Sequence, residues 1–447
     1  MLRAWCFGIG LLLAAGSWQT AFAADLTIWW TKGFYPEEDE GIHRLVEDFQ
    51  KETGTSVELT FNTASEMAGK LLAALEAGQP PDLAFNAGSF PQFKRWAYEG
   101  RFVDLSDIVE PIAKDIIDPA LLQAAYLLNG RTGKQAYYSL PLAASSMHIH
   151  VWKSLLEQAG IGLDRIPREW TAFWDFFCDT VQPAVRQATG KQDIHGVGLP
   201  SSTMGSDTRQ SFDEFLLAHN AWFADAEGKL LFDQPGMRQR IIEALEDFTR
   251  PSKKGCNPPG AVSWDNPDNN ANFLNQTIVM TSNSTLSIPG SQRIINPANY
   301  YKNIATVPWP NALDGSPLPL LFAYFGAEAY ATGRNPEGAK TFLRYLIRPE
   351  RLGLYVETAQ GRYFPALREL AERPFWTDPA DPHRAMLRQQ MTSNPRKRPW
   401  YELSLALEQV DAEKVWPKAI VRILVEGWTA ERAADEAIAR TKQIVGE

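Results

Sequence analysis

Aromatic and polar side chains meet at the end of the first apolar segment, in Trp30-Thr31-Lys32-Gly33. The segment before them, LTIWW, is short and partly β-branched, which predicts a buried strand. In open α/β sheets, ligands bind outside the carboxyl ends of the strands, so we expect Trp30, Thr31 and Lys32 to line a cleft. A ring beside hydrogen-bonding groups favours a sugar as the ligand.

Two more expected strands end in similar groups. Apolar spacing of i, i+3, i+4 predicts helices over 37–53 and 64–77, and alternation predicts strands over 56–61 and 82–85. This β-α-β-α-β order predicts a parallel sheet with right-handed crossovers. The strand ends at 62–65 and 86–90 then lie beside Trp30, which adds Asn86, Ser89 and Phe90 to the candidate site.

The remaining elements are expected from the same patterns. Helices are predicted over 93–99, 120–128, 210–219, 237–248, 336–346, 349–358, 404–415 and 429–444. Strands are predicted over 136–140, 147–152, 194–199, 277–282 and 304–307. The small residues at 143–146 suggest a passage of the chain between two lobes.

Tryptophan is abundant, with 15 residues in the chain. Five of them stand at expected strand ends or beside Pro, Asp and Asn: Trp30, Trp264, Trp309, Trp376 and Trp400. Flat rings with few rotors suit a preformed pocket for a polar, ring-shaped ligand. Side chains alternate along a strand, so only one of Trp29 and Trp30 faces a ligand, and we expect Trp29 in the core.

Motifs for catalysis, phosphate binding and metal binding are absent from the sequence: it has no GxSxG, HExxH or P-loop pattern. His148 and His150 share one face of an expected strand but have no third ligand nearby, so we expect a structural role and neither a metal nor a cofactor. The acidic run 37–40 is expected to complement a helix N-terminus.

The N-terminal 23 residues are typical of a secretory signal peptide, with Arg3, an apolar run at 7–15 and the cleavage signal AFA at 21–23. No later stretch is apolar enough to span a membrane. The net charge of −9 disfavours nucleic acid and anionic lipid as partners. Export permits a disulfide between Cys178 and Cys256, but their spacing does not settle whether they pair.

Segments along the whole chain resemble the periplasmic solute-binding proteins of carbohydrate ABC transporters, the maltose-binding-protein-like group. They occur in this order: LTIWW, FQKETGTSVELTF, KLLAALEAGQPPDLAFNAGSF, YYSLPLAASS, REWTAFWDFF, NFLNQTIVMTSNST, IATVPWP, PEGAKTFLRYLIRPERLGLYVETAQGRYFPALREL and TAERAADEAIARTK. One departure concerns LFAYFGAEAYA, where many relatives have a Gly-Gly-rich segment, and it leaves the ligand size open.

The resemblance implies an α/β fold of two discontinuous lobes, the type II periplasmic binding protein fold, with ligand between the lobes. It places the N-lobe at 24–141 and 285–347, and the C-lobe at 142–284 and 348–447. Besides the residues at the first and third strand ends, the matching site positions are Ser145, Ser146, Asn283, Ser284, Tyr324, Phe325, Arg362, Tyr363 and Trp400. Trp264 joins them from a polar loop.

The resulting hypothesis is a monomeric periplasmic receptor, not an enzyme, that binds a mono- or oligosaccharide or a polyol. The resemblance implies delivery to two permease subunits driven by a cytoplasmic ATPase. One alternative is a secreted glycosidase or lyase that uses carboxylates near Glu38 or Asp265. Another is a binding protein for a different solute, such as a peptide or a sugar phosphate held by Lys32 with Arg362.

Overall fold

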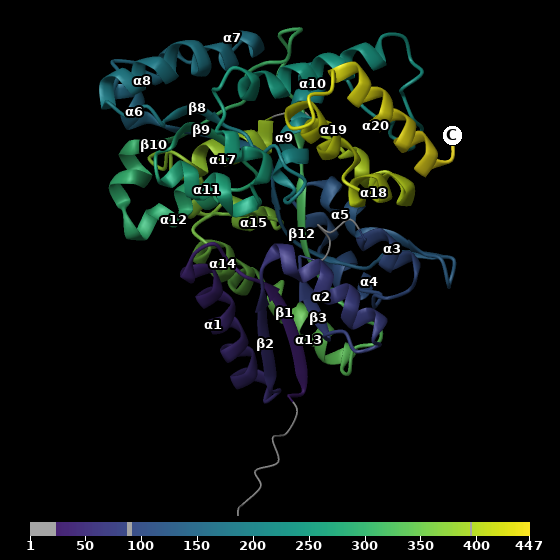
Figure 1. Ribbon diagram of the computed structural model, residues 1–447. Helices are drawn as coiled ribbons and strands as arrows, with labels where there is room; N and C mark the ends of the chain where they lie inside the picture. The colour runs from purple at the N-terminus through teal and green to yellow at the C-terminus, as the bar shows by residue number, and fades with distance from the viewer. Residues whose placement is uncertain (1–23, 87–91, 394–395) are drawn as a thin grey trace, which may run out of the picture.

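The computed structural model describes residues 24–86, 92–393 and 396–447. Two sheets organise the chain, each in its own lobe (Figure 1). The first lobe contains a six-stranded sheet in the order β13-β6-β12-β3-β1-β2, and the second lobe a four-stranded sheet in the order β10-β7-β9-β8. Each sheet contributes to a separate large cluster of buried apolar side chains. The expected two-lobed α/β architecture is confirmed.

The strands are short and mostly buried. Those of the first sheet are β1 (Leu26–Thr31), β2 (Val57–Asn62), β3 (Leu83–Phe85), β6 (Leu140–Ser145), β12 (Ala323–Ala329) and β13 (Phe364–Pro365). Those of the second sheet are β7 (His148–Trp152), β8 (His195–Gly198), β9 (Ile278–Asn283) and β10 (Ile304–Val307). Two small pairs complete the set: β4 (Tyr126–Asn129) with β5 (Lys134–Tyr137), and β11 (Leu320–Leu321) with β14 (Arg396–Lys397).

The first half of the N-terminal lobe follows the expected β-α-β-α-β order. β1 pairs in parallel with both β2 and β3. Between them, α1 (Pro36–Thr53) buries Ile42, Leu45 and Phe49, and it ends at Gly54 with φ 74°, a left-handed conformation that suits glycine. α2 (Ala64–Glu76) begins with a capping box in which Thr63 and Glu66 bond to each other's backbone N–H.

The other helices surround the two sheets (Figure 1). In sequence order before β10 they are α3 (Phe93–Tyr98), α4 (Ser106–Val109), α5 (Pro119–Ala125), α6 (Lys153–Gln158), α7 (Trp170–Asp175), α8 (Gln182–Thr189), α9 (Asp207–Ala218), α10 (Met237–Lys253), α11 (Asn266–Leu274) and α12 (Ser287–Ile295). After β12 they are α13 (Pro336–Leu346), α14 (Pro349–Thr358), α15 (Arg368–Ala371), α16 (Pro374–Thr377), α17 (Arg384–Ser393), α18 (Leu405–Ala412), α19 (Val415–Leu424) and α20 (Ala430–Val445). Within the described ranges, no helix has both the length and the apolarity that crossing a membrane requires.

One predicted helix is too long. The helix expected over 120–128 ends at Ala125, and the next four residues form β4, which pairs antiparallel with β5. The buried residues of β4 alternate, with Leu127 and Asn129 inside and the residues between them exposed. A period of two therefore overrides the helical pattern in this segment.

The strand pairing also differs from the expected lobe boundaries. The first lobe continues through β6 to Ser145, four residues beyond the expected boundary at 141. β10 lies in the second sheet, antiparallel to β7, although 285–347 was assigned to the first lobe. β13 pairs with β6 in the first sheet, although it follows residue 347. Pairing between strands far apart in sequence sets these boundaries, and local patterns do not reveal it.

Cys178 and Cys256 form a disulfide bond with a sequence separation of 78. Cys178 lies in the π-helical turn Phe176–Val181 after α7, and Cys256 follows the end of α10. Both belong to the buried cluster of the second lobe. The structure thus settles the pairing that the sequence left open.

Candidate functional site

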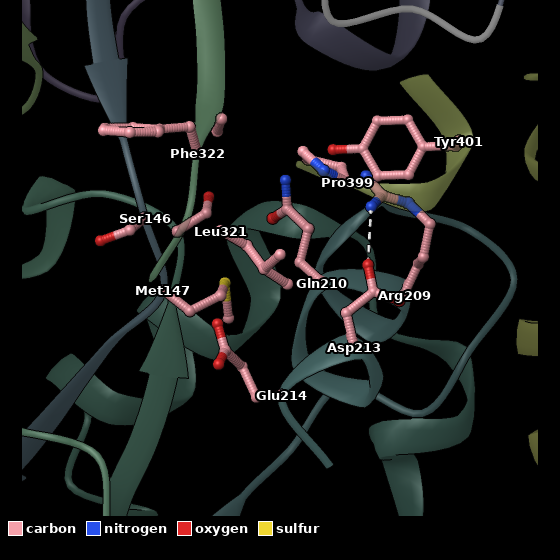
Figure 2. Close-up of a pocket in the computed structure, with 12 residues that line it drawn as sticks. Ser146, Met147, Arg209, Gln210, Asp213, Glu214, Leu321, Phe322, Pro399 and Tyr401 are labelled. Atoms are coloured by element: carbon pink, nitrogen blue, oxygen red, sulfur yellow. Dashed lines mark hydrogen bonds and ion pairs between the residues drawn. The ribbon is translucent and has the colours of Figure 1, made fainter. Parts of the chain in front are cut away.

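A cavity of about 300 Å³, including space open to solvent, lies where the two lobes meet (Figure 2). Its lining comes from five parts of the chain: Ser146, Met147, Arg209, Gln210, Asp213, Glu214, Ser284, Leu321, Phe322, Ala323, Pro399 and Tyr401. Ligand pockets in proteins are typically concave, mostly apolar and supplied with a few placed polar groups. This lining has that composition.

Three segments at the junction of the lobes contribute to the cavity wall, and two of them pass from one sheet to the other. Ser146 and Met147 join β6 of the first sheet to β7 of the second. Ser284 follows β9, and the segment 321–323 leads from β11 into β12 of the first sheet. We refer to these three segments as the crossings. Because the cavity borders all of them, a change in the angle between the lobes changes its shape.

Helix α9 supplies the polar wall. Its apolar residues Phe212, Phe215 and Leu216 recur at i, i+3 and i+4 and belong to the buried cluster of the second lobe. The opposite side of the helix carries two pairs of polar residues four positions apart, Arg209 with Asp213 and Gln210 with Glu214. Arg209 and Asp213 form an ion pair at 3.1 Å, and both line the cavity (Figure 2).

Arg209 is fixed on several sides. Its Nε lies 2.9 Å from Asp411 Oδ1, and its guanidinium carbon lies 3.9 Å from the centre of the Tyr401 ring. Asp213 in turn accepts a hydrogen bond of 2.8 Å from Trp400 Nε1. A guanidinium shared by two carboxylates is held tightly, and the pKa of Arg209 is raised further above its ordinary value by Asp411 despite burial.

Three polar groups of the lining have no hydrogen-bond partner among the described residues. Ser146 Oγ and Gln210 Oε1 are buried atoms without a partner. Glu214 is 4% exposed, and its carboxyl makes no hydrogen bond or ion pair with the described chain. Buried polar groups are almost always hydrogen-bonded in folded proteins. These three therefore mark the place where a ligand's hydroxyl or amino groups would complete the bonding.

Burial changes the protonation of the two acids on α9. Desolvation raises the pKa of Asp213 to about 7, although Arg209 opposes the shift. Desolvation, reinforced by the charge of Asp213, raises the pKa of Glu214 well above its ordinary value. Burial therefore favours the protonated form of the Glu214 carboxyl, which is able to donate as well as accept a hydrogen bond.

The structure places Trp30 in the core of the first lobe and away from this cavity. Its ring is 1% exposed, stacks on Phe85 with centroids 4.2 Å apart, and donates from Nε1 to Tyr355 Oη at 3.2 Å. Trp29 packs on the other face of β1 against a second, smaller cluster, as the alternation predicts. Thr31 is buried and donates to the Phe85 carbonyl at 3.2 Å.

Lys32 is exposed and lines a separate shallow groove on the first lobe, together with Phe34, Asp39 and His43. Asn86 is buried, has φ 75°, and donates its backbone N–H to the Gly326 carbonyl at 2.7 Å. Ser89 and Phe90 lie outside the described residues. The expected strand-end site is thus not assembled around Trp30.

The residues proposed at the crossings lie close to the cavity. Ser146 and Ser284 line it, and Ser145 donates its hydroxyl to the Ser284 carbonyl, which ties the first crossing to the second. Asn283 is buried and donates its side chain to Thr285 O and Ser287 Oγ, both at 2.9 Å. Its amide therefore stabilises the backbone of the segment that follows β9.

Four expected aromatic site residues are buried side chains. Trp400 donates a hydrogen bond to Asp213, which lines the cavity. Trp264 lies in the buried cluster of the second lobe. Tyr324 donates to Ser139 Oγ at 2.7 Å inside the first lobe. Phe325 packs on Tyr363 with ring centroids 4.6 Å apart. The rings that do line the cavity belong to Phe322 and Tyr401.

Arg362 and Tyr363 occupy a buried cluster under α1. The Arg362 guanidinium pairs with Glu38 at 2.5 Å and stacks between the rings of Phe34 and Tyr363, at 4.3 and 4.6 Å. Glu38 is 3% exposed, so the expectation that the acidic run only complements the helix N-terminus in solvent is wrong for this residue. Its pKa is raised by burial even with Arg362 beside it.

His148 and His150 are buried in β7 and bond to side chains of other elements. His148 Nδ1 lies 2.7 Å from Gln390 Oε1, and His150 Nδ1 lies 3.0 Å from Thr306 Oγ1. In the part of the chain that the structure describes, no three His, Cys, Asp or Glu side chains are grouped as metal ligands.

The sequence reasoning missed the polar face of α9. The helix itself was expected over 210–219, and its signal was present: Arg-Gln at 209–210 and Asp-Glu at 213–214, four residues apart and opposite Phe212, Phe215 and Leu216. Such a stripe is usually a solvated face. Here 11 of the 12 residues of the helix are buried, because the C-terminal segments cover that face.

Solved structures of similar shape are solute-binding and sugar-binding proteins of low sequence identity. An ABC transporter solute-binding protein of Thermotoga lettingae TMO, bound with α-D-tagatose, has a TM-score of 0.78 at 20% identity, covering 95% of this chain and 100% of that one. Maltose-bound T. maritima MalE3 gives 0.73 at 18%, covering 94% and 99%. A ribitol complex of a solute-binding protein from Agrobacterium radiobacter K84 gives 0.71 at 17%, covering 94% and 98%. At these identities the likeness shows the shared fold.

Sequence comparison points the same way. The chain is 24% identical over 243 residues to the Escherichia coli (strain K12) protein named "Putative ABC transporter periplasmic-binding protein YcjN". The match covers 54% of this chain and 51% of YcjN, so the chain spans about half the length of this curated relative. The family model of bacterial extracellular solute-binding proteins matches residues 44–385. With most of its length matched and with a cavity between two lobes, the chain belongs to the family of bacterial extracellular solute-binding proteins.

Proposed function

We propose that this protein is the substrate-binding component of an ABC importer and captures a sugar or polyol between its two lobes. The observation that carries the proposal is the set of buried, unpartnered polar groups in the cavity beside the crossings: Ser146 Oγ, Gln210 Oε1 and the Glu214 carboxyl. A ligand with several hydroxyl groups bonds to all three at once. Rotation of the lobes about the crossings then encloses it.

The apolar part of the lining suits the same ligand class. Phe322 and Tyr401 present rings, and Met147 and Leu321 present flexible and branched apolar groups (Figure 2). Sugars and polyols combine C–H surfaces with hydroxyl groups, so they match a lining of rings and placed polar atoms. The ligands bound in the similar structures, tagatose, maltose and ribitol, belong to this class.

Export and partners follow from the same proposal. The N-terminal 23 residues serve as a cleavable signal peptide, the mature chain acts in the periplasm as a monomer, and the liganded form docks on permease subunits driven by a cytoplasmic ATPase. The family membership and the name of YcjN support this placement.

The carboxylates that the enzyme alternative requires are engaged elsewhere. Glu38 pairs with Arg362, and Asp265 caps the N-terminus of α11 by accepting from Asn266 N. For the sugar-phosphate alternative, Arg362 is neutralised by Glu38, and Lys32 lies in a separate groove. These contacts favour binding over catalysis, and a solute without a phosphate group.

Calorimetric titration tests the proposal. A panel of neutral sugars, amino sugars and polyols, including tagatose, maltose, ribitol and glucosamine, is titrated into the mature protein, and tryptophan fluorescence follows Trp400 beside the cavity. We expect at least one sugar or polyol to bind. Gln210→Ala should weaken that binding about tenfold, because one ligand hydroxyl then lacks its partner.

The matched control is Gln187→Ala, an exposed glutamine on α8 that should leave affinity unchanged. Binding of no sugar or polyol in the panel would refute the proposed ligand class. Equal losses in the two glutamine variants would remove Gln210 from the site.

A further inference from the structure

Glu214 stands between two cavities. It lines the cavity at the crossings, where Figure 2 shows its carboxyl directed toward Met147. It also lines a second cavity behind Met147, which is bordered by Arg168, Trp309 and Gln390. The carboxyl is therefore enclosed by the protein, 4% exposed, and yet reachable from the ligand site.

No cation is available to this carboxyl within the described chain. Arg209, the nearest cation on the same helix, is already shared between Asp213 and Asp411. Arg168, across the second cavity, contacts the Pro308 carbonyl at 3.4 Å and forms no ion pair with Glu214.

The other surfaces around the carboxyl carry no positive charge either. The crossings contribute Met147 and Leu321, and the C-terminal segment contributes Tyr401. Gln390 of α17 is neutral and bonds to His148, whose imidazole is kept neutral because burial lowers its pKa to about 4.

The charges around the cavity are unbalanced as a result. Asp213 and Asp411 share the guanidinium of Arg209, whereas Glu214, the next residue along the helix after Asp213, has no cationic partner within the described chain. An ionised carboxylate buried without a partner is strongly unfavourable, so the empty site keeps Glu214 protonated. A positive charge placed beside it removes that penalty and forms a charge-assisted hydrogen bond. A negative charge there is repelled by Asp213.

We propose that Glu214 is the counter-ion for a protonated amine on the ligand, so that the preferred solutes are amino-substituted sugars or polyols. The inference rests on the proposed function and narrows its substrate class. Ser146 and Gln210 bond to the hydroxyl groups, and Glu214 selects the ammonium group. When the ligand binds, Glu214 loses its proton to the buffer and forms an ion pair with the amine.

The test is calorimetry at pH 6, where a sugar amine is already protonated. The probes are D-glucosamine, D-galactosamine and the β-1,4-linked dimer of glucosamine, each paired with the neutral parent: D-glucose, D-galactose and cellobiose. We expect at least one amine to bind tenfold or more tightly than its parent. Titrations in two buffers of different ionisation enthalpy should show that binding of the amine releases close to one proton.

Glu214→Gln keeps the shape of the side chain and removes its charge, so it should abolish both the difference in affinity between each amine and its neutral parent and the proton release. Glu246→Gln, an exposed position on α10, should preserve both. If the neutral parents bind as tightly as the amines, or if Glu214→Gln keeps the preference, the counter-ion proposal is wrong while sugar capture stands. If neither amines nor any neutral sugar or polyol binds, the proposed function itself fails.

Discussion

Replacement of Trp30 by alanine separates a structural role for this residue from a role in binding. The indole is enclosed by Phe85, stacked at 4.2 Å, and by Tyr355, edge-on at 5.4 Å, and it donates a hydrogen bond of 3.2 Å to Tyr355 Oη. Because the ring is 1% exposed, it offers no surface to a ligand in this conformation. Trp30→Ala should therefore act on stability.

The magnitude follows from the contacts that are lost. Removing a fully buried tryptophan side chain costs about 3–5 kcal/mol of unfolding free energy, because burial is lost and a cavity is left. Within that total, the hydrogen bond to Tyr355 accounts for about 1 kcal/mol. Trp30→Phe preserves the stack on Phe85, and we expect it to lose roughly the hydrogen bond and a small volume, about 1–2 kcal/mol.

Urea unfolding followed by far-UV circular dichroism measures the stability, and calorimetry on the folded variants measures ligand affinity. Tyr98→Ala, at an exposed aromatic position of the same lobe, serves as the control and should change stability by less than about 1 kcal/mol. An unchanged unfolding midpoint for Trp30→Ala, together with a large loss of affinity, would show that Trp30 contacts the ligand and would refute the structural role.

Three further predictions concern charges and the disulfide. Arg362→Met leaves Glu38 buried without its partner and should lower the unfolding free energy by about 3–5 kcal/mol, measured by urea unfolding. Burial, reinforced by Asp265, raises the pKa of Asp207 to about 7, so the folded state keeps a proton that the unfolded chain releases. The stability from this group is present near pH 4, and about 3 kcal/mol of it is lost as the pH rises to 7. Asp207→Asn should remove that loss in unfolding curves taken at each pH, and the same pH dependence in both proteins would contradict the prediction. Reduction of the Cys178–Cys256 bond, which closes a loop with a sequence separation of 78, should cost about 4 kcal/mol, detected as a lower urea midpoint in reducing buffer; an unchanged midpoint with free thiols would contradict the chain-entropy argument.

The fold was largely accessible from local patterns. The apolar spacing in α1, α13 and α14 and the alternation in β2 identify these elements, and their order predicts the parallel start of the first sheet. The placement of β10 and β13 was not accessible in this way, since it depends on pairing with β7 and β6 from distant parts of the chain.

The candidate site was predicted only in part. Ser146 and Ser284 follow from the family resemblance, because the crossings occupy equivalent positions in the pattern. Arg209 and Asp213 were missed because a charged helix face normally meets solvent, and here it is covered by Trp400 and Asp411, the former 187 residues away from Asp213. Trp30 was expected in the cleft, but the structure buries it in the core, because a large ring at a strand end suits the core as well.

The position of the cavity against the three crossings has a mechanical consequence. When one rigid body turns about a hinge, each point moves in proportion to its distance from the axis. The cavity lies next to the axis, whereas the outer parts of the lobes, such as α8 in one and α13 in the other, lie far from it (Figure 1). A small adjustment around the ligand is therefore magnified, as by a lever arm, into a large displacement at the surfaces that another protein can contact.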